Sequence, residues 1–253
     1  MQGNQPESNV VAMWSGPRNV STALMYAFAQ RGDTTVWDEP YYAAWLAASG
    51  EPHPMRDAIL AAGPSDPADV AARISAGARP VYYQKHMAHH MLPGFDLASW
   101  FGRARHAFLI RSPEAVLASY TAKYDHVTLD LVGYPQQAAL FDRAADALGA
   151  APPVVRGRDI QRHPRAALVC LTAALGIAFD PAMLSWPAGP KPYDGVWAHH
   201  WYDRAWASTG FAPPAAEQSG ELPAPLARIA DAARPLYEKL ERHALAIEGP
   251  PNP

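Results

Sequence analysis

Two polar segments of this chain carry residue types that bind phosphate or sulfate. The first follows the apolar run Val10–Trp14 and leads into a helical pattern. Backbone N–H groups at the start of a helix have no partner within it, and the helix dipole is positive there, so such a turn binds anions. Arg18 adds a full charge. We therefore predict an anion-binding turn formed by Ser15, Gly16, Pro17, Arg18, Asn19, Val20, Ser21 and Thr22.

The turn lacks the Gly-Lys pair of the Walker A motif, which argues against an ordinary ATPase or GTPase. A plain strand–turn–helix without a ligand is the alternative interpretation. The second polar segment begins at Arg111, where another apolar run ends, and Pro113 suits the first turn of a following helix. Ser119 lies about two helical turns beyond Arg111, so the two side chains can converge on one anion.

Two residues are candidates for a general base. Glu39 stands directly after a strand-like run, and we expect His86 to follow another, so both should face the same edge of the sheet. Glu39 could equally form a structural ion pair, and His86 could simply line a cleft. The sequence leaves both roles open.

The segment Trp186–Pro214 interleaves aromatic and basic side chains, among them Lys191. Such a mixture can stack on a planar base and reach phosphates. It can also be a structured loop that buries its own aromatic rings. We include Lys191 among the predicted donor-binding residues.

Several histidines raise the question of a metal site, and we predict none. The candidates lack the His-Glu-x-x-His arrangement and accompanying cysteine ligands, so a polar cleft lining is the favoured interpretation. They are His86, His89, His90, His199 and His200.

Composition limits the classes of partner. Of 253 residues, 49% are hydrophobic and 18% are charged, as in globular chains, and the net charge of −3 provides no general attraction for nucleic acid or anionic membranes. The single cysteine, Cys170, excludes an intrachain disulfide and fits a reducing compartment. With no secretion signal or apolar run of membrane-spanning length, we expect a cytoplasmic protein.

The elements that must position these residues alternate between strand and helix. This pattern predicts an α/β fold, a doubly wound parallel sheet flanked by helices, with a single domain over 9–248 and flexible termini at 1–8 and 249–253. The predicted strands are Val10–Ser15, Thr34–Trp37, Pro80–Lys85, His106–Arg111 and Pro153–Arg156. The predicted helices are Val20–Gln30, Pro67–Ala76, Pro113–Tyr124, Gln136–Leu148, Pro164–Leu175 and Pro223–Leu245. We expect Ser49–Asp69 to be a surface excursion over the site.

The two phosphate segments together resemble the sulfotransferases that use 3′-phosphoadenosine 5′-phosphosulfate (PAPS). In that family the turn after the first strand binds the 5′-phosphosulfate and an Arg…Ser pair binds the 3′-phosphate, which implies these roles for Ser15–Thr22 and for Arg111 with Ser119. The likeness extends through Arg158-Asp159-Ile160 to Ile177. It implies a P-loop-like fold without a catalytic metal.

The resemblance also bears on catalysis. Cytosolic members have a lysine in the first loop where this chain has Arg18, as the tyrosylprotein branch does. Arginine can stabilise the leaving phosphate but does not readily give up a proton. Bacterial glycolipid and tyrosylprotein relatives place a catalytic glutamate where Glu39 stands, and cytosolic relatives place a catalytic histidine where His86 stands.

The implied activity is sulfuryl transfer from PAPS to a hydroxyl or amine of a small-molecule acceptor, leaving adenosine 3′,5′-bisphosphate (PAP). Arg18, Glu39 and His86 are the implied catalytic residues. A nucleotide-dependent kinase and a PAP-binding protein without transferase activity remain alternatives. We expect no nucleic-acid partner. The sequence does not decide whether the protein forms a homodimer.

Overall fold

The structure, a computed structural model, describes residues 9–124, 126–214 and 222–248. The predicted flexible termini at 1–8 and 249–253 lie outside the described residues. Among the described residues, no helix is long and apolar enough to cross a membrane.

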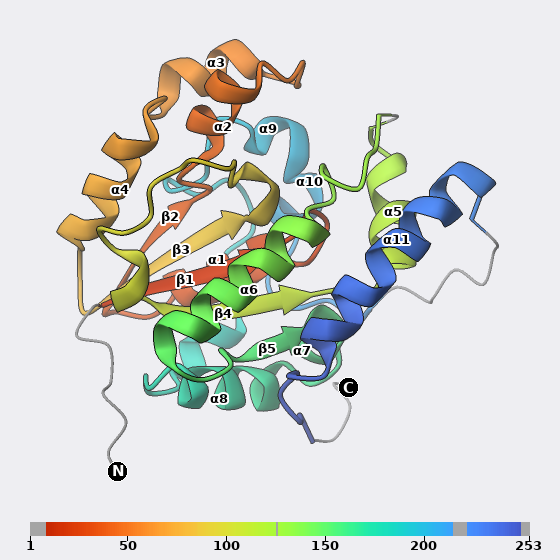
Figure 1. Cartoon of the computed structure of the whole chain (residues 1–253). Coiled ribbons are helices and arrows are strands. Elements are labelled where there is room, and N and C mark those ends of the chain that lie inside the picture. The colour runs from red at the N-terminus through yellow and green to blue at the C-terminus, as the bar shows by residue number, and fades with distance from the viewer. Residues whose placement is uncertain (1–8, 125, 215–221, 249–253) are drawn as a thin grey trace.

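Five parallel strands form one sheet in the order β2-β3-β1-β4-β5 (Figure 1). All five predicted strands are present, with ends shifted by up to two residues. Their bounds are β1 Val10–Ser15, β2 Thr34–Asp38, β3 Val81–Met87, β4 Arg105–Ile110 and β5 Val154–Arg156. Every strand therefore ends at the same edge, where ligands bind in open α/β sheets.

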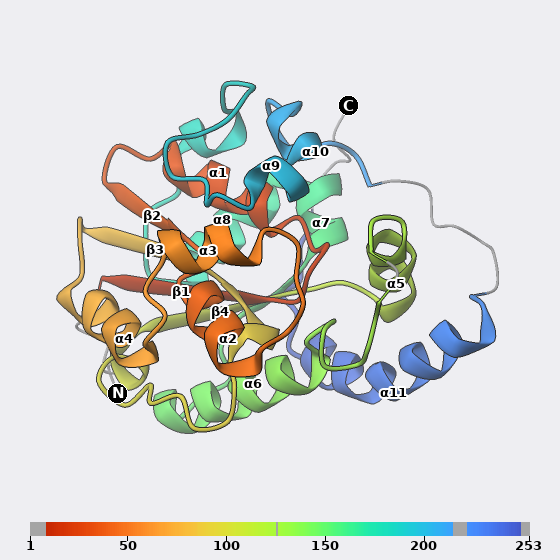
Figure 2. The ribbon, with the colours of Figure 1, turned by 90° about the horizontal axis from the view of Figure 1, so that it is seen from above.

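Helices cover both faces of the sheet, which confirms the doubly wound α/β fold. Seen from above, α1 and α8 lie on one side and α4, α6 and α11 on the other (Figure 2). The helices of these layers are α1 Ser21–Ala29, α4 Pro67–Ala76, α6 Tyr134–Leu148, α8 Pro164–Ala174 and α11 Ala224–Glu241. Two more, α5 Pro113–Thr121 and α7 Gly157–Arg162, follow β4 and β5.

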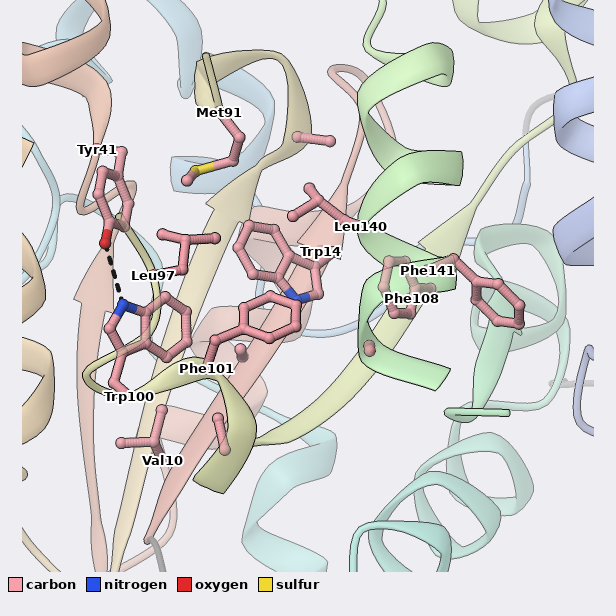
Figure 3. Packing of buried hydrophobic residues seen from close by; sticks show 14 of the residues in the cluster. Val10, Trp14, Tyr41, Met91, Leu97, Trp100, Phe101, Phe108, Leu140 and Phe141 are labelled. Carbon is pink, nitrogen blue, oxygen red and sulfur yellow. Dashed lines mark hydrogen bonds between the residues drawn. The ribbon is translucent and has the colours of Figure 1, made fainter. Parts of the chain in front are cut away.

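Strand β1 is buried on both faces, which accounts for its continuous apolar run. On one face Trp14 packs with Trp100, Phe101 and Phe108, and the indole of Trp100 donates a hydrogen bond of 3.1 Å to the Tyr41 hydroxyl (Figure 3). Burial of such large side chains stabilises the fold by about 1.5–3 kcal/mol each. The core thus fixes β1 and the turn that follows it.

The chain after β2 is more helical than expected. Helix α2, Tyr42–Ser49, was not predicted, and the supposed surface excursion contains helix α3, Arg56–Ala62. Five consecutive residues of α2, Tyr42–Leu46, are buried, so the helix shows no polar face and no amphipathic period. The segment 186–214 likewise contains two short helices, α9 Ala198–Trp201 and α10 Asp203–Trp206. Short 3₁₀ turns complete the fold at Ala88–His90, Phe101–Arg103 and Pro181–Leu184.

Candidate active site

The predicted anion-binding turn lies between β1 and α1 and has a constrained backbone. Arg18 and Val20 have φ values of 60° and 52°, in the left-handed region that residues other than glycine seldom adopt. A Cβ on Gly16 would lie 2.7 Å from the carbonyl oxygen of Val132, so only glycine fits there. The Asn19 amide donates a 2.9 Å hydrogen bond to the Leu109 carbonyl. Such strain persists where the surrounding structure enforces it, often at ligand sites.

The structure brings Arg18 into contact with both Arg111 and Ser119. The Arg18 Nε donates to Ser119 Oγ at 3.1 Å, and Arg111 Nη1 donates to the Arg18 carbonyl at 2.7 Å. The Tyr134 hydroxyl in turn donates to the Arg111 carbonyl at 2.8 Å. The residue that follows β4, the last turn of α5 and the β1–α1 turn therefore form one continuous site.

A third arginine, Arg204 of α10, adds its charge to this pair. Burial lowers the pKa of the Arg18 guanidinium, and the charges of Arg204 and Arg111 lower it further. Burial also lowers the pKa of Arg111, and Arg204 contributes. Among the described residues, no carboxylate forms an ion pair with any of the three. We call Arg18, Arg111 and Arg204 the arginine cluster; its uncompensated charge suits an anion with several oxygens.

A second centre lies at the ends of β2 and β3, around Lys85. Its Nζ lies 2.8 Å from Asp38 Oδ1 and 2.6 Å from Glu39 Oε1, and it also hydrogen-bonds the Tyr202 hydroxyl. The Tyr202 hydroxyl donates to Asp38 Oδ2 at 2.8 Å, and the Gly195 N–H donates to the same oxygen at 3.2 Å. We call Asp38, Glu39, Lys85 and Tyr202 the lysine network.

Glu39 has the properties of a proton acceptor. Burial, opposed by Lys85 and assisted by Asp38, raises its pKa to about 7, and a base is most effective when its pKa is near the working pH. Its φ of 43° is another left-handed value in a residue other than glycine. Oε1 faces Lys85, while Oε2 lies 4.0 Å from Nε2 of His90. Oε2 is therefore the oxygen available to an acceptor.

His86 lies inside β3 rather than after it, so its predicted position was wrong. It is 1% exposed, and its ring stacks on Trp14 at 4.3 Å between centroids. Its Nε2 donates to Gln84 Oε1 at 2.9 Å, and burial lowers its pKa to about 3. These contacts make His86 a neutral core residue.

Lys191 does not join the arginine cluster. Its ammonium hydrogen-bonds the Gly189 carbonyl and lies 4.8 Å from the centroid of the Tyr26 ring. The rings of His89 and His90 meet edge to face. His90 is buried and His89 is partly buried, and loss of solvent lowers the pKa of both. Among the residues the structure describes, no group of three or more His, Cys, Asp or Glu could hold a metal ion.

Sequence reasoning missed four contributors to the site: Asp38, Lys85, Tyr202 and Arg204. Asp38 is adjacent to Glu39, and a lysine inside a buried strand needs a carboxylate partner, so the sequence contained a signal for the pairing of Asp38 with Lys85. Tyr202 and Arg204 stand in the aromatic and basic segment that was singled out, but nothing in their spacing marked those two.

The site thus combines a backbone-constrained turn after β1, which carries the arginine cluster, with a separate lysine network at the ends of β2 and β3. The sulfotransferase domain family matches residues 9–244, so the chain belongs to the sulfotransferase family. The resemblance predicted from the phosphate segments is thereby confirmed.

Solved structures share the fold. The sulfotransferase domain of the olefin synthase of Synechococcus PCC 7002 aligns with a TM-score of 0.51 at 18% identity, covering 92% of this chain and 98% of that chain. A sulfotransferase from Alicyclobacillus acidocaldarius aligns with a TM-score of 0.51 at 15% identity, covering 94% and 97%. At these identities the likeness concerns the fold alone.

Two curated relatives come from Arabidopsis thaliana. Branched-chain-amino-acid aminotransferase-like protein 1 is 35% identical over 239 residues, which cover 94% of this chain and 42% of that protein. The corresponding protein 2 is 36% identical over 207 residues, covering 81% and 36%. The chain thus spans less than half the length of either relative, and their names describe longer proteins.

Proposed function

We propose that the protein is a PAPS-dependent sulfotransferase that acts in the cytoplasm on a hydroxyl or amine of a small molecule. The observation that carries this proposal is the arginine cluster: three guanidinium groups that approach one another with no carboxylate partner within residues 9–124, 126–214 and 222–248. Holding like charges together costs free energy unless an anion offsets it. A ligand with several phosphate or sulfate oxygens would supply that anion.

The residues present fit PAPS. Arg111 and Ser119 would hold the 3′-phosphate, and the turn Ser15–Thr22 with the N–H groups that begin α1 would hold the 5′-phosphosulfate. Arg18 and Arg204 add positive charge to the same region. When bound, PAPS supplies a sulfuryl group activated by its anhydride bond to phosphate.

The acid–base centre lies where an acceptor could reach it. Parallel strands are spaced about 4.8 Å apart, so the end of β2 lies roughly 10 Å from the end of β1, two strands away. Above pH 7 Glu39 is ionised and can take a proton at Oε2. Lys85 and Tyr202 fix Oε1, which orients the carboxylate. Glu39 is therefore our proposed base, and His86 is not.

Thermal unfolding in the presence of ligands tests the donor. A ligand that binds only the folded state stabilises it by about 2.7 kcal/mol at one hundred times its Kd. We expect PAP to raise the unfolding temperature more than ATP with magnesium does. Arg204→Met should reduce the PAP shift, whereas Arg103→Met, at the opposite edge of the sheet, should preserve it.

The outcomes separate the rival functions. A larger shift with ATP and magnesium would favour a nucleotide-dependent kinase. A PAP shift without sulfuryl transfer to any acceptor would favour a PAP-binding protein that is not an enzyme.

A further inference from the structure

The side chain of His90 faces the proposed base from the 3₁₀ turn that follows β3. Its Nε2 lies 4.0 Å from Oε2 of Glu39, the oxygen that Lys85 and Tyr202 leave free. This separation is longer than a hydrogen bond. Within the described part of the chain, neither atom has a hydrogen-bond partner. The two atoms are therefore both available to a third polar atom.

Both atoms also keep some contact with solvent. The enclosed polar atoms that lack a hydrogen-bond partner in the described ranges include Nδ1 of His90, but neither its Nε2 nor Oε2 of Glu39. His90 is 2% exposed and Glu39 is 9% exposed, so the small opening of each side chain includes the atom that faces the other. An acceptor atom that enters here meets both side chains at once.

Neighbouring rings fix the orientation of the His90 imidazole. It stacks on Tyr42 with 4.4 Å between the ring centroids and on Trp45 with 4.9 Å, and both partners belong to the buried helix α2. Side chains locked by packing hold their polar atoms in place without help from a ligand. Nε2 is thus set opposite Glu39 in the free protein.

The environment of His90 determines which ring nitrogen carries hydrogen. Burial, assisted by the charges of neighbouring basic groups, holds the pKa of His90 well below its usual value, so the ring is neutral and has one N–H. A hydrogen on the enclosed Nδ1 would be a buried donor with no acceptor among residues that the structure describes. A hydrogen on Nε2 faces the carboxylate of Glu39 instead. We therefore assign the hydrogen to Nε2.

A hydroxyl oxygen fits between the two side chains. At about 2.7 Å from Oε2 and about 2.9 Å from Nε2, it makes an angle of roughly 90° with these atoms, which lie 4.0 Å apart. It donates its hydrogen to Oε2 and accepts the Nε2 hydrogen with one lone pair, which leaves its second lone pair for sulfur. An amine nitrogen has only one lone pair. If that pair attacks sulfur, the Nε2–H group faces an N–H of the amine and loses its acceptor.

We propose that His90 is a specificity-determining residue that makes the protein select hydroxyl over amine acceptors. The proposal rests on the proposed function, because only a transferase needs a nucleophile between Glu39 and His90. In the transfer, the acceptor oxygen forms a bond to sulfur, and the bond from sulfur to the bridging oxygen breaks with its electron pair remaining on the phosphate of PAP. The acceptor's proton moves to Oε2 of Glu39, and His90 keeps its own proton throughout.

Nitrogen NMR of the full chain labelled with ¹⁵N-histidine tests the tautomer without any acceptor. At slightly alkaline pH we expect a neutral His90 ring with its hydrogen on Nε2. The signals are assigned by their loss in His90→Gln. A hydrogen on Nδ1 would overturn the proposal, because Nε2 would then have nothing to donate.

Matched acceptors test the selectivity: p-cresol with p-toluidine, and cyclohexanol with cyclohexylamine. Each pair exchanges a hydroxyl for an amine on one carbon skeleton, and the measured quantity is the ratio of kcat/KM, hydroxyl over amine, for transfer from PAPS. His90→Leu should lower this ratio at least tenfold, because it removes a hydrogen bond to the hydroxyl and an unpaired donor beside the amine. His90→Gln retains an N–H donor and should restore most of the ratio.

His89→Leu is the matched control, since it removes the adjacent imidazole, whose ring meets that of His90 edge to face. It should leave the ratio unchanged. Equal ratios in the original chain and in His90→Leu would overturn the proposal, and so would amine sulfation by the original chain as efficient as hydroxyl sulfation. Loss of PAP binding, or of transfer to every acceptor of the set, would instead reject the proposed function and the selectivity with it. The two failures are thus distinguishable.

Discussion

The arginine cluster and the lysine network lie at the same edge of one sheet, yet they differ in whether their charges have a partner of opposite sign. At the ends of β1 and β4, three cations approach one another, and the described part of the chain provides no counter-charge for them. At the ends of β2 and β3, one lysine is enclosed by two carboxylates and a tyrosine hydroxyl.

The charge of the arginine cluster would be balanced only by a bound anion. The charge of Lys85 is balanced by carboxylates of the protein itself. Removing one member of a buried ion network leaves an uncompensated charge and is strongly destabilising. Removing a cation from a repelling group costs the free protein a hydrogen bond but relieves repulsion there, so the main loss falls on the bound state. Substitutions in the lysine network should therefore affect folding and proton transfer, and those in the arginine cluster should affect binding.

The largest expected effect is on turnover in Glu39→Gln. The amide preserves shape but cannot take a proton, so turnover should fall by roughly a hundred- to ten-thousandfold, the usual contribution of a general base. PAP affinity should be retained. Single-turnover transfer assays and calorimetry measure the two quantities.

His86→Asn is the matched comparison, because His86 was the rival base. Its loss should lower the unfolding temperature and leave the turnover of folded protein within a fewfold of the original. If His86→Asn folds fully but is inactive, and Glu39→Gln is nearly active, then His86 and not Glu39 is the general base.

Arg111→Ala should come next in size. The loss of a charge-assisted contact to a phosphate should weaken PAP by about 2–3 kcal/mol, roughly a hundredfold in Kd. The unfolding temperature without ligand should change little, and calorimetry with Arg103→Ala as the control measures the affinity. An unaltered Kd in a folded variant would show that Arg111 lies outside the donor site.

Tyr202→Phe should have a smaller effect of a different kind. Its hydroxyl donates to Asp38, so its loss should destabilise the fold by about 1–3 kcal/mol. Its hydrogen bond also lowers the pKa of Glu39, so the acid limb of the turnover profile should move to higher pH. Tyr237→Phe, remote on α11, should leave the profile in place. If the pH profile of turnover for Tyr202→Phe overlays that of the original protein, the Tyr202 hydroxyl does not influence the pKa of Glu39.

A separate effect, which concerns neither site's chemistry, is the change of stability at acid pH. Burial lowers the pKa of His86 and His89 to about 3 and of His106 to about 4, whereas an unfolded histidine titrates near 6.5. Below pH 6.5 the unfolded chain binds protons that the folded chain does not. Stability should therefore fall as pH drops from about 6.5 to 4, by up to about 1.4 kcal/mol per pH unit for each such group.

Glu39 acts in the opposite direction, because its pKa is raised on folding, and its contribution is lost as pH rises from about 4.5 to about 7. Denaturant unfolding across this range gives the slope. His106→Gln should make the slope shallower, and the exposed His126→Gln should not. Equal slopes in all three proteins would show that these buried imidazoles do not control acid stability.

The sequence predicted the sheet well and marked Arg18, Arg111 and Ser119 as candidates, because these features depend on local signals. Each strand is an apolar run, Arg111 directly follows β4, and Ser119 lies on the short helix α5 that begins two residues later. Helix α2 escaped prediction because it is buried on most sides and shows no amphipathic period. Tyr202 and Arg204 escaped because the chain returns to the site more than 80 residues after Ser119, and no local pattern marks that approach.

Transfer of labelled sulfate from PAPS tests the central claim most directly. The protein is incubated with ³⁵S-labelled PAPS and a panel of phenols and amines, alongside Glu39→Gln and a parallel incubation with γ-³²P-labelled ATP and magnesium. We predict a sulfated product with the original chain, at least a hundredfold less with Glu39→Gln, and no phosphorylated product. Phosphoryl transfer from ATP, or equal sulfation by both proteins, would contradict the account.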